Sequence, residues 1–228
     1  MSLILNIDTA TEMAHISLAK DGEVLQQLFN DSQKDHAAFL QPSIKFLFDN
    51  NSLKIKNIDA VAITAGPGSY TGLRVGMASA KGICYALNKP LITINTLEVL
   101  AASAMQLLPG KIISQSILLC PMMDARRMEV YTAIYNSTLE TILPPCAMLL
   151  HENSFAGNLE KEELLFFGNG SIKWKSICSS PSAFFDVVAI MPEALARLSF
   201  SRFNNNSFSD LAAIQPAYLK EFYDAGNK

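Results

Sequence analysis

Residues 65–74 read Ala65-Gly66-Pro67-Gly68-Ser69-Tyr70-Thr71-Gly72-Leu73-Arg74, and this glycine-rich stretch decides the fold. It follows the nearly continuous apolar run 58–64, which is typical of a buried parallel strand. Ser69 and Thr71 are candidate N-caps, so we expect a helix to begin at this loop. Such a loop either binds a phosphate at the helix N-terminus or lets the helix pack very closely against its surroundings.

The helix predicted after this loop, which ends near Leu87, carries small residues at helical spacing. One ladder consists of Gly72, Gly76 and Ala80, and a second consists of Ala78, Gly82 and Ala86. Because a glycine inside a helix costs about 0.5–1 kcal/mol relative to alanine, these ladders predict a close approach to another backbone. That backbone belongs either to the chain's own sheet or to another subunit. The segment matches neither the P-loop nor the Rossmann glycine pattern, so it gives little support for nucleotide binding.

Length and composition favour one large globular domain or two small ones. Half of the 228 residues are hydrophobic, 17% are charged and the net charge is −3, so the chain lacks the positive charge with which proteins bind nucleic acid unaided. The four cysteines are scattered without a C-x-x-C pair, which favours reduced thiols. Without a signal-peptide pattern or an apolar run long enough for a membrane span, we expect a cytoplasmic protein with no membrane contact.

The first half of the chain predicts three strands followed by alternating helices and strands. The expected elements are strands at 3–8, 14–20 and 23–29, a helix at 35–49, a strand at 58–64, the small-residue helix, a strand at 91–94, and a helix from the cap residue Thr96 to about Leu107. This order is that of a ribonuclease H-like unit, in which parallel strands extend a three-strand meander.

The second half repeats this pattern more faintly. We expect strands at 116–120, 129–135 and 164–167, a polar turn at 124–127, a strand-to-helix turn at 168–170 and a helix at 192–203. The sequence therefore predicts an α/β protein with two lobes, each a mixed sheet with helices. The predicted lobes are residues 1–107 and 108–228, and a C-terminal helix is free to pack back on the first lobe.

Asp8 ends the first predicted strand, where actin-like and ribonuclease H-like enzymes place a metal-binding carboxylate. In the purely structural interpretation, the same carboxylate caps the following turn through backbone amides. The candidate residues of a degenerate phosphate loop are Asp8, Thr9, Thr11, Gly66, Gly68 and Ser69. Because the second half offers no further glycine-rich phosphate loop with its own acid, we expect no ATP chemistry.

Other catalytic and metal-binding patterns are absent from the sequence. The three histidines lie far apart, at His15, His36 and His151. His36 is expected to be exposed in a first helical turn. The polar group Asp124, Arg126, Arg127 and Glu129 is interpreted as a solvated hairpin turn with local ion pairs, and its role stays open. We therefore assign no catalytic and no metal-binding residue.

Three stretches of the chain resemble the TsaB (YeaZ) family. They are residues 4–11, residues 66–76 with the following Ala80-Lys81-Gly82, and residues 123–131, which read Met-Asp-Ala-Arg-Arg-Met-Glu-Val-Tyr. Beyond Tyr135 the resemblance is loose and is anchored at 168–170 and 216–220. The resemblance implies a two-lobed actin-like ATPase fold without a competent ATPase site.

The resemblance also implies a scaffold subunit in tRNA modification. TsaB-like proteins pair with and activate the catalytic subunit TsaD, and with the ATPase TsaE they support threonylcarbamoyl transfer to the adenosine beside the anticodon. A homodimer is implied when TsaD is absent. We expect contact with tRNA only through these partners and no cofactor held by this chain alone, while a nucleotide at a subunit junction is left open. The metal-binding H-x-x-x-H of TsaD is missing, because Leu40 stands where its second histidine would be.

The resemblance places the subunit interface on the first two long helices. We assign the partner-binding face to Leu40, Ile44, Leu47, Gly72, Gly76 and Ala80, with packing rather than charge supplying the affinity. Two alternatives stay open. One is an ATP-dependent small-molecule kinase of the same fold, which would bind ATP at Asp8. The other is a ribonuclease H-like nuclease, in which Asp8 would meet Asp59 or Asp124 around a metal.

Overall fold

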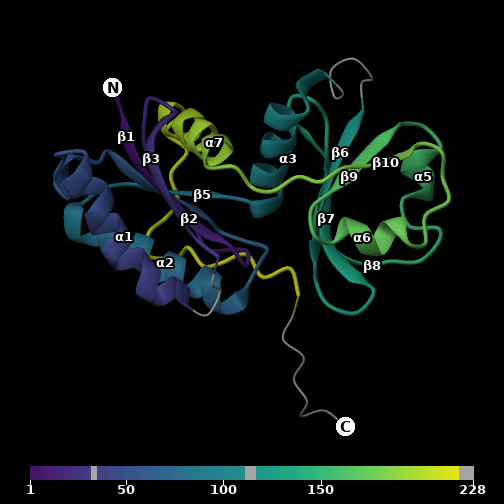
Figure 1. Ribbon diagram of the computed structural model, residues 1–228, viewed down its shortest axis with the longest axis horizontal. Helices are drawn as coiled ribbons and strands as arrows, with labels where there is room; N and C mark the ends of the chain where they lie inside the picture. Colours follow the sequence, from purple (N-terminus) through teal and green to yellow (C-terminus); the bar gives the residue numbers. More distant parts are fainter. Residues whose placement is uncertain (32–34, 111–116, 221–228) are drawn as a thin grey trace, which may run out of the picture. The chain divides into compact units, whose positions relative to one another are not determined.

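The computed structural model describes residues 1–31, 35–110 and 117–220 (Figure 1). The chain separates into two compact units, the first made of Met1–Leu107 and Val188–Pro216, the second of Leu108–Val187 and the residues from Ala217 onward. The expected division after residue 107 is also found here. The segment Val188–Pro216 was counted with 108–228, with a C-terminal helix left free to pack back on the first lobe. It belongs to the first unit, because its helix packs on the first sheet.

The first unit is built on a five-stranded mixed sheet with the order β3-β2-β1-β4-β5. Its strands are β1 (Leu3–Asp8), β2 (Ala14–Lys20), β3 (Glu23–Asn30), β4 (Ala60–Thr64) and β5 (Leu91–Ile94). The first three form an antiparallel meander, and β4 and β5 add to β1 in parallel. This is the expected topology, since tight turns join antiparallel strands and helical crossovers join parallel ones.

Helices cover both faces of this sheet. On one face lie α1 (His36–Asn50) and α2 (Tyr70–Leu87), side by side in Figure 1. On the other face lies α7 (Pro192–Asn204), which also contacts α3 (Thr96–Leu107), while η2 (Ile55–Asn57) precedes β4. The alternation of β1 explains both layers: Leu5 and Ile7 join the core beneath α1 and α2, and Asn6 accepts a hydrogen bond of 2.6 Å from Ser199 of α7.

Local signals fix the helix ends, with one exception. The Ser69 hydroxyl accepts from the Gly72 amide at 3.3 Å and so caps α2, which ends at Asn88 in the left-handed conformation. Thr96 is not the cap of α3, contrary to the prediction. Asn95 holds that position and accepts from the Leu97 amide at 2.9 Å, because the Thr96 amide is bonded to the Gly66 carbonyl oxygen.

The second unit contains a sheet of its own with the order β10-β9-β6-β7-β8. Its elements are β6 (Leu118–Asp124), β7 (Glu129–Tyr135), β8 (Thr141–Leu149), α5 (Ala156–Leu159), β9 (Leu164–Phe167), α6 (Ser171–Lys175) and β10 (Ala183–Phe185). The predicted strand at 116–120 begins at a residue outside the described part. The strand β8 was not predicted from the sequence, because the adjacent Pro144 and Pro145 normally argue against a strand. They are tolerated here because β8 lies at the edge of the sheet.

The two sheets share one topology. Read from the opposite end, the second order is β8-β7-β6-β9-β10, which matches β3-β2-β1-β4-β5 strand for strand. In each unit a three-strand antiparallel meander is extended by two parallel strands. The sequence shows no repeat, so this correspondence comes from the fold alone.

The ladder Gly72, Gly76 and Ala80 lies on the buried side of α2, with Gly72 and Gly76 against Thr9, and this burial corrects the expected partner-binding face. A Cβ on Gly76 would stand 2.9 Å from Ile63 Cδ1 and still closer to the Thr9 hydroxyl, and one on Gly72 would clash with the Thr9 carbonyl oxygen. The α1 residues of that face, Leu40, Ile44 and Leu47, are likewise buried in the core. All six serve packing within the unit, since an amphipathic helix first buries its apolar side against its own sheet.

Replacing Gly76 with alanine should therefore destabilise the first unit. The added methyl group overpacks the contact with Thr9 and Ile63, and we expect a loss of about 1–3 kcal/mol in the free energy of unfolding, measured by urea denaturation. Gly82→Ala on the same helix is the matched control, because nothing lies within 4 Å of its Cβ position. The control should gain about 0.5–1 kcal/mol from helix propensity. Equal effects of the two substitutions would contradict the buried packing.

Candidate functional site

The turn after β1, where a phosphate loop was considered, is closed by its own hydrogen bonds. Asp8 is fully buried, and its Oδ1 accepts from the Ala10 amide at 2.9 Å and from the Thr64 hydroxyl at 2.6 Å. The Thr9 hydroxyl donates to the Gly72 carbonyl oxygen at 2.8 Å. Asp8 therefore caps the turn, as in the structural interpretation of the sequence, and ties β1 to β4.

The glycine-rich loop completes this closure. The Ser69 amide, at the N-terminus of α2, donates to the Ala10 carbonyl oxygen at 2.7 Å, and a Cβ on Gly68 would lie 2.9 Å from the carbonyl carbon of Ala10. Gly66 is also buried, whereas the partly exposed Thr11 hydroxyl bonds to the Met13 carbonyl oxygen. The candidate phosphate-loop residues do come together. However, the Ser69 amide, which could donate to a phosphate at this helix N-terminus, already donates to the Ala10 carbonyl oxygen.

Two histidines line the buried side of this turn. His15 on β2 faces Asp8 across the meander, with 3.5 Å between Nδ1 and Oδ2. Burial lowers the pKa of His15 and outweighs the opposing charges of Asp8 and Glu193, so its imidazole is neutral near pH 7. His36, expected to be exposed, is only 3% accessible, and its Nε2 lies 3.1 Å from the Thr11 carbonyl oxygen. That contact joins α1 to the turn and explains the burial.

Neither a metal centre nor the nuclease arrangement is found in the described part of the chain. Residues 1–31, 35–110 and 117–220 contain no group of three or more His, Cys, Asp or Glu side chains placed to hold a metal ion. Asp59 accepts from the Leu3 amide at 2.8 Å, at the opposite end of β1 from Asp8, roughly 16 Å along the strand. Asp8 and Asp59 therefore do not converge.

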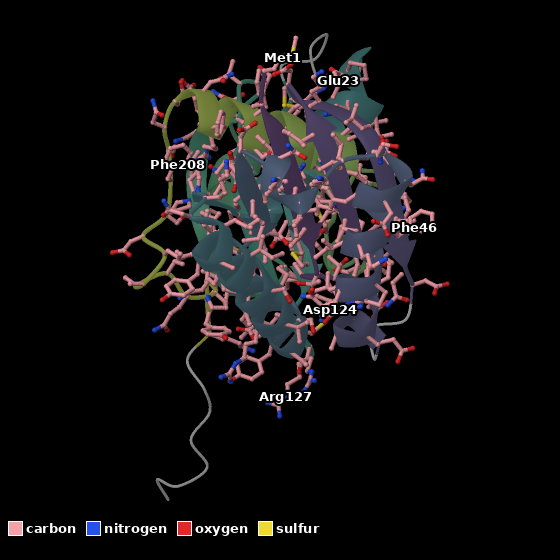
Figure 2. All side chains as sticks on the ribbon, turned by 90° about the vertical axis from the view of Figure 1, so that its left-hand side faces the viewer. Met1, Glu23, Phe46, Asp124, Arg127 and Phe208 are labelled. Atoms are coloured by element: carbon pink, nitrogen blue, oxygen red, sulfur yellow. The ribbon has the colours of Figure 1, made fainter. Side chains whose placement is uncertain are left out.

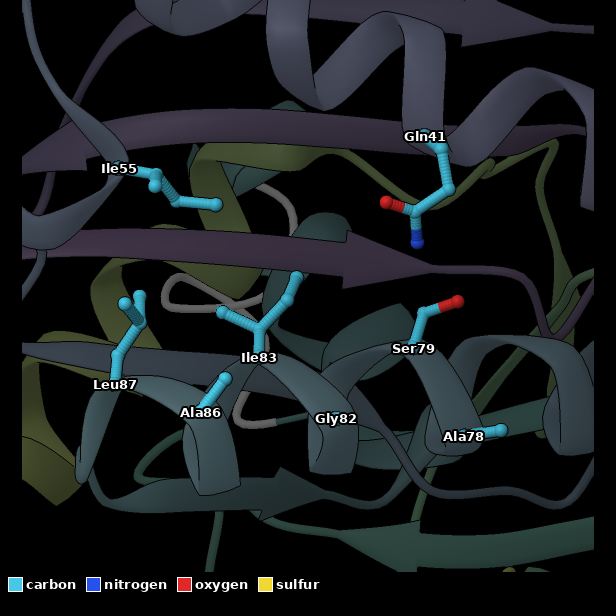
Figure 3. A pocket seen from close by; sticks show the side chains of 8 residues that line it. All are labelled: Gln41, Ile55, Ala78, Ser79, Gly82, Ile83, Ala86 and Leu87. Carbon is cyan, nitrogen blue, oxygen red and sulfur yellow. The ribbon is translucent and has the colours of Figure 1, made fainter.

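An open apolar groove lies between α1, α2 and η2 (Figure 3). Its volume is about 570 Å³, and the lining residues are Gln41, Ile55, Ala78, Ser79, Gly82, Ile83, Ala86 and Leu87. The second small-residue ladder of α2 forms its floor, and Ala78, Gly82 and Ala86 are all exposed. The spacing of small residues thus revealed both faces of α2, but it could not tell which one the sheet would cover.

The two helices α1 and α2 also carry exposed aromatic side chains. Tyr85 is 81% accessible and Tyr70 43%, both on α2, and Phe46 on α1 is 51% accessible and points outward in Figure 2. The Tyr70 hydroxyl accepts from Arg74, whose guanidinium lies 5.1 Å from the centre of the Tyr70 ring.

The second unit holds a polar cluster at the β6–β7 turn. Asp124 accepts from the Arg126 amide at 2.6 Å and pairs with Lys173 at 3.0 Å, while Glu129 pairs with Lys220. Although partial burial alone would raise it, the pKa of Asp124 is held below its ordinary value by the Arg126 amide and the Lys173 ammonium. The exposed turn is as expected, but the predicted local ion pairs are not: in the described residues Asp124 and Glu129 pair with the distant Lys173 and Lys220 instead of Arg126 and Arg127. No local pattern could have predicted these two lysines.

The comparisons with known proteins cover most of the chain. The family model TsaD, described as tRNA N6-adenosine threonylcarbamoyltransferase, matches residues 25–221. The tRNA threonylcarbamoyladenosine biosynthesis protein TsaB of Bacillus subtilis is 31% identical over 64% of this chain, and the match spans 62% of that protein, less than two thirds of its length. The TsaB of Buchnera aphidicola from Schizaphis graminum is 28% identical over 90% of this chain and 95% of its own.

Solved structures support the same architecture. A Pseudomonas aeruginosa protein described as similar to the peptidase YeaZ superposes with a TM-score of 0.83, covering 96% of this chain and all of that one at 23% identity. A polyphosphate/ATP-glucomannokinase from Arthrobacter reaches a TM-score of 0.50 over 88% of this chain and 99% of that one, at 10% identity. The fold is therefore the two-lobed α/β fold of the actin-like ATPases, as predicted. No helix in the described ranges is long and apolar enough to cross a membrane.

The buried, neutral His15 should make the first unit sensitive to acid. Since its pKa is lower in the folded state than in the unfolded state, protonation favours unfolding, and stability falls as the pH drops below about 6.5. Urea midpoints measured at about pH 7.5 and about pH 5.5 should differ less in His15→Gln than in the wild type. His151→Gln, at an exposed position, should leave the difference intact. An unchanged pH dependence in His15→Gln would refute the assignment.

Proposed function

Because the chain belongs to the family of the tRNA N6-adenosine threonylcarbamoyltransferase TsaD, and within it to the TsaB (YeaZ) group, we propose that it is a non-catalytic subunit in threonylcarbamoyladenosine synthesis on tRNA. In this role it pairs with and activates a TsaD-like catalytic subunit and works with a TsaE-like ATPase. Alone, it forms a homodimer. A cytoplasmic location and a nucleotide at a subunit junction stay predictions.

The closed turn at Asp8 is the observation that carries the non-catalytic assignment. In an ATPase of this fold, the amides of such a turn and of the following helix would face the phosphates. Here the Ser69 amide and Oδ1 of Asp8 are bonded to protein groups, and Gly72 packs directly against the Thr9 carbonyl oxygen, which supports the non-catalytic assignment. Opening the turn would break several buried hydrogen bonds, each worth about 0.5–1.5 kcal/mol, and leave their groups unpaired.

The same closure weighs against the alternative of an ATP-dependent kinase. The likeness to the glucomannokinase concerns the fold alone, and fold does not determine chemistry. A kinase would need a free phosphate position at Asp8, whereas a scaffold needs none. Calorimetric titration of the isolated chain with Mg-ATP separates the two, and the scaffold assignment expects no binding.

The groove between α1 and α2 is the surface we propose for subunit pairing. The buried ladder of α2 is used by the unit itself, so the exposed ladder of Ala78, Gly82 and Ala86 is the one left for a partner. A helix pair of a related subunit can approach these small residues closely, with Tyr85 and Phe46 packing at the sides. Burial of apolar surface, rather than charge, would supply the affinity.

Reconstitution tests the proposed function directly. Threonylcarbamoyl transfer to tRNA should require this chain together with the TsaD-like and TsaE-like subunits, because the activated catalytic subunit forms only in the pair. Omitting the chain should reduce modified adenosine, quantified by mass spectrometry of digested tRNA, to near background. Full activity of the remaining subunits without this chain would refute the proposal.

A bulky residue in the groove should block pairing without unfolding the chain. We expect Gly82→Trp to abolish co-purification with the TsaD-like subunit, because the indole would occupy the space of the partner helix. Gly157→Trp in the second unit is the matched control, since nothing lies within 4 Å of that Cβ position either. Circular dichroism should report a folded protein for both. Normal pairing of a folded Gly82→Trp variant would exclude the groove as the interface.

A further inference from the structure

The tip of the β6–β7 hairpin carries two arginines in an unfavourable backbone conformation. Arg126 and Arg127 are consecutive and have φ values of 67° and 47°, in the left-handed region that glycine and asparagine tolerate best. Hydrogen bonds from Ala125 to Glu129 and from Glu129 to Arg126 hold the turn in this shape. Because Asn and Gly would stabilise the same turn better, the requirements of folding do not explain the two arginines.

Among the residues that the structure describes, no acidic side chain pairs with these two arginines. The two carboxylates that border the turn are neutralised by lysines: Asp124 by Lys173 at 3.0 Å, and Glu129 by Lys220. Arg126 and Arg127 are exposed and form no ion pair with any residue that the structure describes, and Arg127 points away from the protein in Figure 2. In a chain with a net charge of −3, the tip is thus a local excess of two positive charges.

We propose that Arg126 and Arg127 bind phosphate groups of an RNA backbone. Guanidinium groups form paired, charge-assisted hydrogen bonds to phosphate oxygens, and a projecting hairpin can reach a backbone that a flat acidic surface would repel. The inference rests on the proposed function, which makes a tRNA the relevant RNA. It revises the expectation of purely indirect tRNA contact. That expectation followed from the total charge of the chain, whereas recognition depends on the local charge.

The double substitution Arg126→Asn, Arg127→Gly separates charge from structure. It removes both guanidiniums while placing preferred residues at the two left-handed positions, so the thermal unfolding midpoint should stay the same or rise. Binding of a tRNA transcript to the complex of full-length chain and TsaD-like subunit, measured by fluorescence anisotropy, should weaken at least about tenfold at physiological salt. The slope of log K against log salt should become shallower by about 1.5–2, as expected for two lost phosphate contacts.

Two further variants complete the test. Arg126→Lys, Arg127→Lys keeps both charges and should retain most of the affinity. Lys20→Ala, Arg197→Ala removes two exposed positive charges from the first unit and should leave both affinity and salt slope as in the wild type. Wild-type affinity and salt slope in the Asn-Gly variant would overturn the inference. The inference would also be overturned if the Asn-Gly variant lost pairing with the TsaD-like subunit while RNA binding was unaffected. The tip would then contact a protein.

The outcomes distinguish this inference from the proposed function. If the wild-type complex modifies tRNA and the Asn-Gly variant binds tRNA equally well, the hairpin inference fails and the proposed function stands. If the remaining subunits modify tRNA fully without this chain, the proposed function fails whatever the binding data show. Reduced tRNA affinity with intact pairing and an unchanged or higher unfolding midpoint supports the inference.

Discussion

The packing of α2 against the turn after β1 is the contact on which the rest of the first unit depends. The Thr9 hydroxyl bonds to the Gly72 carbonyl oxygen at 2.8 Å, and neither Gly72 nor Gly76 leaves room for a side chain at this contact. This close approach sets the orientation of α2 on the sheet. With the ladder of Gly72, Gly76 and Ala80 facing the unit's own core, the second ladder of Ala78, Gly82 and Ala86 is exposed.

In the second unit a glycine also packs closely against the end of the first strand of its sheet. The Gly170 amide donates to the Met122 carbonyl oxygen at 3.0 Å, and a Cβ there would lie 2.9 Å from the carbonyl carbon of Met123. In both units, a glycine after the fourth strand thus packs against the end of the first. The helix that follows has 18 residues in α2 but only 5 in α6, so α6 offers a much shorter helical surface than α2.

The proposed function rests on association rather than on chemistry by this chain. The buried carboxylate of Asp8 supports the fold, and the apolar groove beside α2 is the surface that we propose for a partner. The proposed partner and the proposed RNA contact use different surfaces for physically different reasons. Small residues permit close packing, whereas the arginines of the hairpin tip supply positive charge. The neighbouring carboxylates of Asp124 and Glu129 pair with lysines and not with these arginines.

The sequence alone determined the elements whose signals are local. The first meander, α1, α2 and β7 follow from alternation and helical spacing, and their bounds agree with the prediction to within a residue or two. The strand β6 (Leu118–Asp124) was predicted at 116–120 and extends four residues further toward the turn. Tertiary structure decided which ladder of α2 is buried, why His36 is hidden, that α7 joins the first sheet, and that β8 forms despite its prolines. Each of these depends on contacts between residues far apart in the chain, and periodicity reveals that a helix has two faces without revealing which of them the sheet will cover.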